Sequence, residues 1–306
     1  MVGVGFLAWI GTRRGLTPLT PAAENSQGVQ QLYVFIGAFA SLIFLVVTVP
    51  LALFMVRFRS RTRDRTVEGP QIRGHARLEL VWTAIPVLIL IAIAAFTFIK
   101  LGQIDNPTAQ AAAGETDLVV HVESRQFYWR FVYENGAVSF DTLRLPVDRK
   151  VRFDVTSPDW DVIHSFWVPA LGPKIDAIPG YVNHLRLLPE KTGTYQGKCA
   201  ELCGIQHTMM LFNVQVMPQA EFDAWLRRAP AREDLGQEIF QQVCSKCHFA
   251  APEYAPNIAG NPILTEPDAL RVLIENGRRR MPPVGRGWSE REIRALLEFT
   301  GAESGG

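Results

Sequence analysis

Residues 197–210 read GKCAELCGIQHTMM, and this segment decides what kind of domain surrounds it. Within twelve positions it places two thiols, an imidazole and a thioether, at Cys199, Cys203, His207 and Met210. Sulfur ligands combined with imidazole suit copper. The glycines in the segment favour a loop between strands, in which ligands converge from a turn without helical spacing. At least one more ligand is then expected from another part of the chain.

The sequence upstream of this loop predicts strands and offers the missing ligand. Residues 151–155 alternate apolar and polar side chains, as a half-buried strand does, and His164 follows shortly after them. Short strands separated by Gly and Pro predict a β-sandwich of about 110 residues, closed by a short helix at 219–228. The other segments rich in β-branched, aromatic or aliphatic residues are 127–133, 184–188 and 211–217.

The runs HSFWVPALGPKIDAIPG, at 164–180, and CAELCGIQHTMM, at 199–210, together resemble the copper A domain of cytochrome oxidase subunit II. The resemblance implies a cupredoxin sandwich that holds two copper ions bridged by two cysteine sulfurs. The residues that it assigns to copper are Cys199 and Cys203 as bridging thiolates, His164 and His207 as terminal imidazoles, and Met210 as a weak thioether ligand.

Glu201 lies between the two cysteines. The resemblance implies that its backbone carbonyl is a copper ligand and that its side chain reaches a magnesium ion shared with subunit I. A different metal stays open on ligand count alone. Two thiolates and two imidazoles would also satisfy a tetrahedral structural zinc ion.

Two apolar runs predict a membrane hairpin near the N-terminus. Residues 32–56 and 80–99 carry no charge, and each run is long enough to cross a hydrocarbon core of about 30 Å as a helix. Pro86 in the second run is tolerated better in lipid than in water. A buried soluble helix is the alternative for each run. Two spans so close together favour the hairpin.

The segment between the two spans is rich in arginine, and by the positive-inside rule it is cytoplasmic. Both chain ends are then expected on the periplasmic face of a bacterial inner membrane, which the protein crosses twice. The apolar run at 2–10 is followed, not preceded, by basic residues, so it is a poor secretory signal. The arginines between the spans are Arg57, Arg59, Arg61, Arg63, Arg65, Arg73 and Arg77.

The second span opens with LELVWTAIP, at 78–86, which resembles the start of the second helix in the same family. In that family the glutamate, here Glu79, is placed at the entrance of a proton path into subunit I. An acidic residue at a helix end is equally explained by solvation at the membrane interface. Both readings of Glu79 stay open.

The remaining two cysteines form the motif Cys244-Ser245-Lys246-Cys247-His248, the pattern that attaches haem c covalently. Two thiols bind the vinyl groups and the histidine binds the iron. Met281, followed by a proline, is the expected sixth ligand because a thioether gives a relatively high potential. A methionine of the core is the alternative. A disulfide framework would show a different cysteine pattern.

Helices surround this motif. A helix at 235–243 leads into it, a second at 265–276 is expected to open with Thr265 as N-cap and to stop at Gly277, and 289–292 is a capping box before a last helix. The region 234–302 therefore resembles a class I cytochrome c.

The expected fold class is a multidomain membrane protein, with a transmembrane hairpin, an all-β cupredoxin-like sandwich and an all-α cytochrome c domain. At 306 residues the chain has room for these parts, joined by a small and polar linker at 106–115. The expected limits are 1–31 for an N-terminal segment, 32–101 for the hairpin, 116–228 for the copper A domain and 234–302 for the cytochrome domain.

The combined resemblance is to subunit II of caa-type oxidases, in which a cytochrome c is fused to the copper subunit. It implies that electrons pass from haem c through copper A to haem in subunit I. There O2 is reduced to water and protons are translocated, so this chain is a non-oxygen-reducing subunit of cytochrome-c oxidase. The implied partners are subunit I, subunit III and an external cytochrome c or another periplasmic donor.

Other functions would also fit part of this sequence. Reduction of nitric or nitrous oxide also uses such copper centres, but Glu79 and the residues after it favour the oxidase. From another class, the chain could be an electron shuttle or a copper-delivery protein without a catalytic partner. Nucleic acid is not expected, because the net charge is only +1 and the arginines are clustered.

One segment departs from the family. Where the family has an aromatic cluster of the type QWYW at the face that receives electrons, this chain has Gln126-Phe127-Tyr128-Trp129. Phe127 replaces the first tryptophan. The sequence leaves open whether Tyr128 or the fused haem takes over that role.

Overall fold

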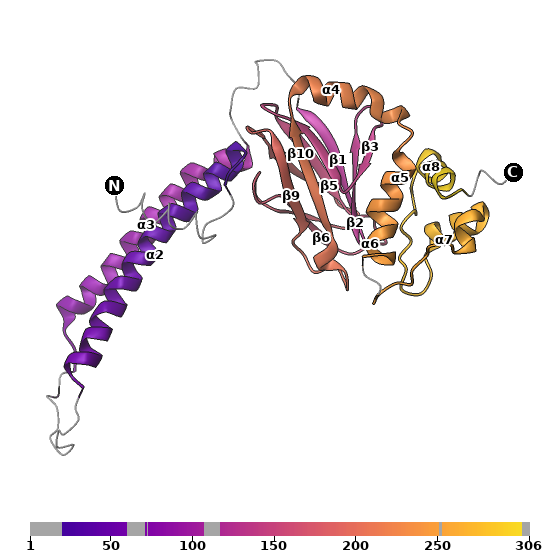
Figure 1. Ribbon diagram of the computed structural model, residues 1–306. Coiled ribbons are helices and arrows are strands. Elements are labelled where there is room, and N and C mark those ends of the chain that lie inside the picture. Colours follow the sequence, from indigo (N-terminus) through magenta and orange to yellow (C-terminus); the bar gives the residue numbers. More distant parts are fainter. Residues whose placement is uncertain (1–19, 60–70, 72, 107–116, 251–252, 302–306) are drawn as a thin grey trace. The chain divides into compact units, whose positions relative to one another are not determined.

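The computed structural model describes residues 20–59, 71, 73–106, 117–250 and 253–301 (Figure 1). Residues 27–104 form one compact unit, and residues 21–26 together with the chain from 105 onward form a second. Most of the N-terminal segment, of the arginine-rich loop and of the 106–115 linker lies outside the described residues.

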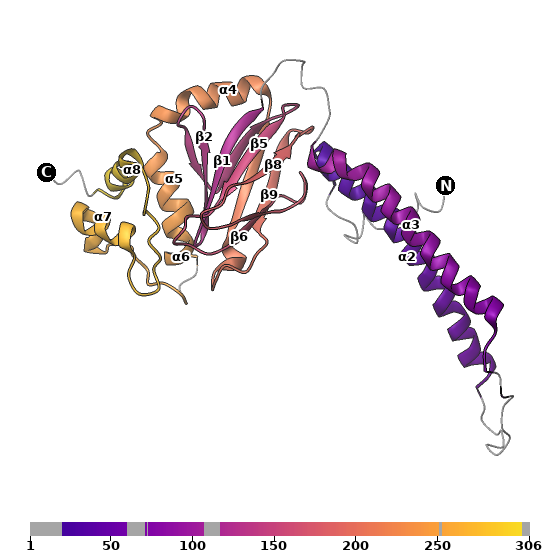
Figure 2. The ribbon, with the colours of Figure 1, turned by 180° about the vertical axis from the view of Figure 1, so that it is seen from behind.

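The first unit is a pair of long helices, α2 (Glu24–Arg57) and α3 (Ala76–Asp105), which lie side by side in both views (Figures 1 and 2). Both are long and apolar enough to cross a membrane, with mean hydropathies of 2.6 and 2.5 and with their apolar side chains exposed. At 1.5 Å per residue each exceeds a hydrocarbon core of about 30 Å. The rings of Phe35 and Phe96 hold the two helices together, with 4.3 Å between their centroids.

The second unit begins with two five-stranded sheets packed face to face. The first has the strand order β3-β2-β1-β5-β8 and the second β4-β10-β9-β6-β7. The predicted strands are present within a residue of their expected ends. The bounds are β1 (Leu118–Arg125), β2 (Tyr128–Tyr133), β3 (Val138–Phe140), β4 (Thr142–Pro146), β5 (Val151–Thr156), β6 (His164–Trp167), β7 (Ile175–Ala177), β8 (Asn183–Leu187), β9 (Gly193–Cys199) and β10 (Leu211–Met217).

Aromatic side chains fill the space between these sheets. Trp129, Phe166 and Phe212 are fully buried, and the rings of the last two stack with centroids 5.1 Å apart. Gly197 on β9 leaves room for this stack, because a Cβ atom there would lie 2.1 Å from the Phe212 ring. A substitution at Gly197 would therefore overpack the core. This packing fixes the ends of β6 and β9, where the candidate copper ligands begin.

Helices follow the sandwich, as the sequence predicts. Most expected ends are confirmed, including the Ser289 capping box and the stop at Gly277. The expected N-cap Thr265 is wrong, because α7 begins at Pro267, whose missing N–H and fixed φ suit the first helical position. The bounds are α4 (Gln219–Arg228), η2 (Ala229–Ala231), α5 (Leu235–Ile239), the π-helical η3 (Phe240–Cys244), α6 (Ser245–His248), η4 (Pro262–Thr265), α7 (Pro267–Asn276) and α8 (Glu290–Thr300).

The helical region and the sandwich share a hydrophobic core. Gly236 lets α5 and α8 approach closely, because a Cβ atom there would lie 1.9 Å from the Ala295 carbonyl oxygen. The outer side chains of β2 and β3 complete the core from the other side. The two parts are therefore packed as one body. The buried members of this core are Tyr128, Val138, Phe140, Leu235, Ile239, Val243, Leu270, Ile274, Trp288, Ile293, Leu296 and Leu297.

Residues just before α2 also belong to the second unit. The Ala22 N–H donates to the Ala170 carbonyl at 2.8 Å, and the Ala22 carbonyl accepts from the Glu190 N–H at 2.8 Å. Both Ala22 and Ala23 are buried in the sandwich core. This segment, part of the expected N-terminal segment 1–31, thus contributes to the β unit.

Candidate metal centres

The first candidate centre lies where three strands of the second sheet end. Strand β9 stops at Cys199, β10 begins at Leu211, and the intervening loop carries Cys203 and His207. Strand β6, which begins at His164, pairs directly with β9. This pairing brings together residues that are 35 positions apart in the sequence.

All the expected copper donors converge on this loop. His164 Nδ1 lies 3.9 Å from Cys199 Sγ, and the two cysteine sulfurs are 3.9 Å apart. His207 Nδ1 lies 3.6 Å from Cys203 Sγ, and Met210 Sδ lies 3.8 Å from the same sulfur. Each imidazole thus lies next to a different thiol. A cluster with one imidazole beside each sulfur suits a pair of metal ions that share the two sulfurs.

Glu201 enters the cluster through its backbone. Its carbonyl oxygen lies 3.2 Å from Cys199 Sγ, while its side chain is exposed. With this oxygen, the cluster offers three sulfurs, two imidazoles and one carbonyl. A structural zinc ion takes four ligands in a tetrahedron, so this donor set exceeds what one zinc ion needs. Soft sulfur and imidazole suit copper.

Asp161 orients the buried imidazole of His164. Its carboxylate accepts a hydrogen bond from His164 Nε2 at 3.4 Å, which leaves Nδ1 directed toward Cys199. Burial alone would lower the pKa of His164, but the hydrogen bonds and charges of Asp161 and Cys199 outweigh it and raise that pKa. Supporting carboxylates of this kind fix the tautomer of a metal-binding histidine. This role of Asp161 was not predicted from the sequence, because its spacing from His164 does not reveal the contact.

Gln126 supports the loop from the first sheet. Its side-chain amide donates to the Cys203 carbonyl at 2.6 Å, and its backbone N–H donates to Asp161 at 3.0 Å. Gln126 therefore ties β1 and β2 to both the cysteine loop and the carboxylate beside His164. The sequence placed Gln126 next to Phe127 but did not predict these two hydrogen bonds.

The two thiols of this loop influence each other's pKa. Their contact lowers the pKa of the Cys199 thiol, whereas the same contact and burial raise the pKa of Cys203. A second thiolate beside the first would place two anions together without a cation. A metal pair held by these residues would supply the positive charge that both thiolates need.

The second candidate centre lies on the helical region. The attachment cysteines stand one helical turn apart, Cys244 at the end of η3 and Cys247 in α6. His248 Nδ1 lies 2.7 Å from the Pro256 carbonyl oxygen, so Nδ1–H donates and Nε2 stays available for an iron ligand. Burial raises the pKa of the Cys244 thiol to about 12. The residues fit a covalent haem with an axial histidine.

Met281, the expected sixth haem ligand, sits in a tight turn. Its backbone N–H and carbonyl both bond to Arg278 at 3.0 Å. Gly277, with φ of 68°, precedes this turn, and a Cβ atom there would lie 2.5 Å from the Met281 carbonyl oxygen. The half-buried Met281 side chain packs against the core shared with the sandwich. The structure thus fixes the backbone around Met281 and leaves its role as a ligand a prediction.

Glu79 lies in the first turn of α3, in the first unit. Its carboxylate accepts a hydrogen bond from the His75 N–H at 3.0 Å, and the Leu78 N–H donates to His75 Nδ1 at 3.3 Å. These contacts satisfy backbone donors at the start of a helix. Glu79 therefore has a local structural role, and its place on a proton path stays a prediction.

Known proteins match nearly the whole chain. Residues 15–99 match the family described as cytochrome c oxidase subunit II, transmembrane domain, and residues 139–217 match its periplasmic domain. The cytochrome c oxidase subunit 2 of Alkalihalophilus pseudofirmus is 31% identical over 85% of this chain and 78% of that protein. The chain belongs to the cytochrome c oxidase subunit II family. Residues 231–299 match the family described as cytochrome c oxidase, cbb3-type, subunit III.

Two further relatives carry the same name. The Bacillus subtilis cytochrome c oxidase subunit 2 is 33% identical over 67% of this chain and 65% of that protein. The solved periplasmic domain of subunit II of the Bradyrhizobium japonicum oxidase is 33% identical, with a TM-score of 0.36 over 38% of this chain and 94% of that one.

This subunit II is therefore a membrane-anchored part of a haem–copper oxidase, with a cytochrome c domain fused to its C-terminus. Its family implies copper A for the β domain and haem for the helical one. Oxygen reduction belongs to the complex. The predicted fold class, a transmembrane hairpin followed by a cupredoxin-like sandwich and a cytochrome c domain, is confirmed.

Proposed function

We propose that subunit II takes up electrons at covalent haem c and passes them through dinuclear copper A to haem in subunit I. The observation that carries this proposal is the burial of Tyr128 against the cytochrome domain. Phe127, Tyr128 and Trp129 are 9%, 1% and 0% exposed. Phe127 and Trp129 belong to the sandwich core, whereas Tyr128 lies in the core shared with the helices. An external donor cannot touch any of these three side chains.

Contacts to the cytochrome domain cover Tyr128 specifically. Its hydroxyl donates to the Val284 carbonyl at 2.5 Å and accepts from Trp288 Nε1 at 3.0 Å. Both partners belong to the helical region. Phe127 instead packs in the sandwich core with the copper loop, where its ring lies beside Gly204. The replacement of tryptophan by Phe127 is consistent with electrons arriving from the docked haem.

We assign the ligands as follows. Cys199 and Cys203 would hold the copper pair as shared thiolate ligands, His164 and His207 would be its imidazole ligands, and the Glu201 carbonyl and Met210 thioether would be weaker ligands. Cys244 and Cys247 hold the haem, with His248 and Met281 on its iron. Copper A and haem c supply the one-electron chemistry when bound. The copper donors His164, Cys199, Cys203 and Met210 are buried, which would keep the geometric change on electron transfer small.

The remaining partners follow from the family and from the arrangement of charge. The exposed Glu201 side chain is free to reach a magnesium ion shared with subunit I. The arginines between the spans place their loop in the cytoplasm and the copper and haem domains on the periplasmic side. Subunit III and an external cytochrome c complete the proposed set of partners. For Glu79 we retain the entrance of a proton path as a proposal.

Metal and haem content tests the proposal directly. The purified subunit should hold two copper ions and one haem that remains attached on a denaturing gel, because every cysteine is committed to one of these sites. Elemental analysis and a haem stain measure both. Zinc in place of copper, or haem lost on denaturation, would contradict the assignment. Copurification with a large haem-bearing membrane subunit then separates the oxidase from a free electron shuttle.

A further inference from the structure

The haem-attachment turn touches the copper loop through one side chain. Cys247 Sγ lies 2.9 Å from Gln206 Oε1, although 41 positions separate the two residues. Gln206 is 2% exposed and directly precedes His207, a proposed copper ligand. A buried amide is retained where it has a partner. The partner of Gln206 here is the sulfur that carries the haem.

The chemistry of this contact changes when haem is attached. A free Cys247 thiol donates its hydrogen to Gln206 Oε1, but a thioether sulfur has no hydrogen to donate. The Gln206 amide has donors as well as an acceptor, and rotation by half a turn exchanges them. With haem attached, the amide NH2 group would face the sulfur. The contact would then be kept, with Gln206 as the donor.

Lys246 holds the same turn at its other side. Its ammonium group pairs with the buried Asp141 and donates to the Leu211 carbonyl at 3.1 Å, directly after the copper loop. It also lies 3.5 Å from the Phe127 carbonyl oxygen. Lys246 and Cys247 are neighbours in the sequence, so these contacts fix both residues between the two cysteines of the motif. The turn cannot slide along the copper loop.

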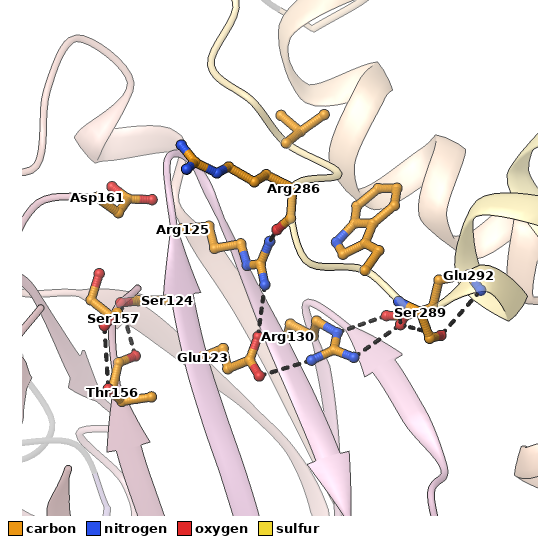
Figure 3. A network of polar contacts seen from close by, with 12 residues as sticks. Glu123, Ser124, Arg125, Arg130, Thr156, Ser157, Asp161, Arg286, Ser289 and Glu292 are labelled. Carbon is orange, nitrogen blue, oxygen red and sulfur yellow. Dashed lines mark hydrogen bonds and ion pairs between the residues drawn. The ribbon is translucent and has the colours of Figure 1, made fainter. Parts of the chain in front are cut away.

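Farther from the copper loop, a charged network fixes the orientation of the cytochrome domain (Figure 3). Arg130 on β2 donates twice to the Glu292 carboxylate, at 2.6 and 2.9 Å, and Glu292 also closes the capping box of α8. Arg130 donates in addition to Glu123, which accepts from Arg125. Arg125 reaches the Arg286 carbonyl across the same interface. The short Cys247–Gln206 contact is therefore held within a rigid frame.

We propose that Gln206 is a positioning residue, which holds the haem-attachment turn against the copper loop and makes the chain Cys247–Gln206–His207 the coupling path between the two centres. This inference rests on the proposed function. Each transfer moves one electron from the haem side to the copper side, and no bond of the protein forms or breaks. The path replaces contact between an external donor and the covered aromatic segment.

The test substitutes Gln206 in the complete oxidase. In Gln206→Leu and in the unbranched Gln206→Met the polar contact to Cys247 is lost. Electron transfer weakens with the distance and the number of contacts between the two centres, so haem-to-copper transfer measured by flash photolysis should slow severalfold. Gln241→Leu, an exposed site in the same helical run, is the matched control and should leave the rate unchanged.

Two measurements separate positioning from other effects. The haem potential and the copper absorption spectrum should stay unchanged. Relative to the unsubstituted oxidase, amide hydrogen exchange should become faster in residues 244–249 but not in residues 235–239. If the transfer rate is unaffected in a variant with an intact copper spectrum, or if it slows only because the haem potential shifts, the proposal is overturned. If the unsubstituted oxidase shows no haem-to-copper transfer at all, the proposed function fails instead.

Discussion

The proposed copper ligands come from two places in the chain, with four side chains in one loop and His164 on a neighbouring strand. Cys199, Cys203, His207 and Met210 fall within twelve positions, and the structure brings their sulfur and nitrogen atoms together. His164 was harder to predict, because its place depends on the pairing of β6 with β9. Asp161 and Gln206 were missed because a polar residue beside a ligand gives no sign of what its side chain contacts.

The two kinds of sulfur in this loop should differ in function. Cys203 Sγ contacts the side chains of Cys199, His207 and Met210 at once, whereas the Met210 thioether lies against Cys203 Sγ at 3.8 Å. Cys203→Ser should therefore abolish the dinuclear centre, and Met210→Leu should only alter its spectrum and potential, because a weak axial ligand tunes a copper site. Absorption and electron paramagnetic resonance spectra measure both. Equal, mild effects of the two substitutions would mean that the ligands are wrongly assigned.

The secondary-structure elements were predictable to the extent that their signals are local. Alternation predicted β5, the Ser289 capping box predicted the start of α8, and Gly277 predicted the end of α7. The docking of the helices on β2 and β3 was not predictable, because Tyr128 and Phe140 look like ordinary strand residues. Only their long-range partners, such as Trp288, reveal that the outer side of these strands is a second core.

The ion pair between β2 and α8 should contribute strongly to this docking. The Arg130 and Glu292 side chains are 10% and 1% exposed, and removal of one partner from a buried pair costs about 3–5 kcal/mol. Arg130 keeps Glu123 as a partner, so Glu292→Leu should lower the free energy of unfolding of the second unit by at most this amount. The double variant Arg130→Met with Glu292→Leu should recover most of it. Denaturant unfolding followed by haem absorbance measures both.

A control substitution and the pH dependence of stability isolate the contribution of the ion pair. Ser289→Ala removes the capping partner of Glu292 but keeps the pair, so it should cost only about 1 kcal/mol. Burial would raise the pKa of Glu292, but Arg130 outweighs it and holds that pKa below its usual value. The pair therefore stabilises the fold fully at pH values above the usual pKa of a glutamate, and less as the pH falls through the lower folded value. Acid sensitivity that persists in the double variant would contradict this account.

The fixed position of the cytochrome domain determines the order in which the haem and the copper are reduced. Only 229–234 separate α4 from α5, and the domains also share a buried core. A short tether alone gives an effective concentration on the order of millimolar. The shared core also prevents the cytochrome domain from moving away from the sandwich, because undocking would expose Tyr128, Phe140 and Trp288 to water.

The haem-to-copper step should therefore be first order, with a rate constant independent of the concentration of the oxidase. Flash photolysis of the complete complex over a hundredfold dilution range measures it directly. Reduction of the haem by external cytochrome c should remain second order, since that donor must diffuse to the exposed side of the cytochrome domain. The copper should then become reduced only after the haem. A copper reduction rate that rises with donor concentration while the haem is still oxidised would mean that the covered aromatic segment, and not the fused haem, receives the electrons.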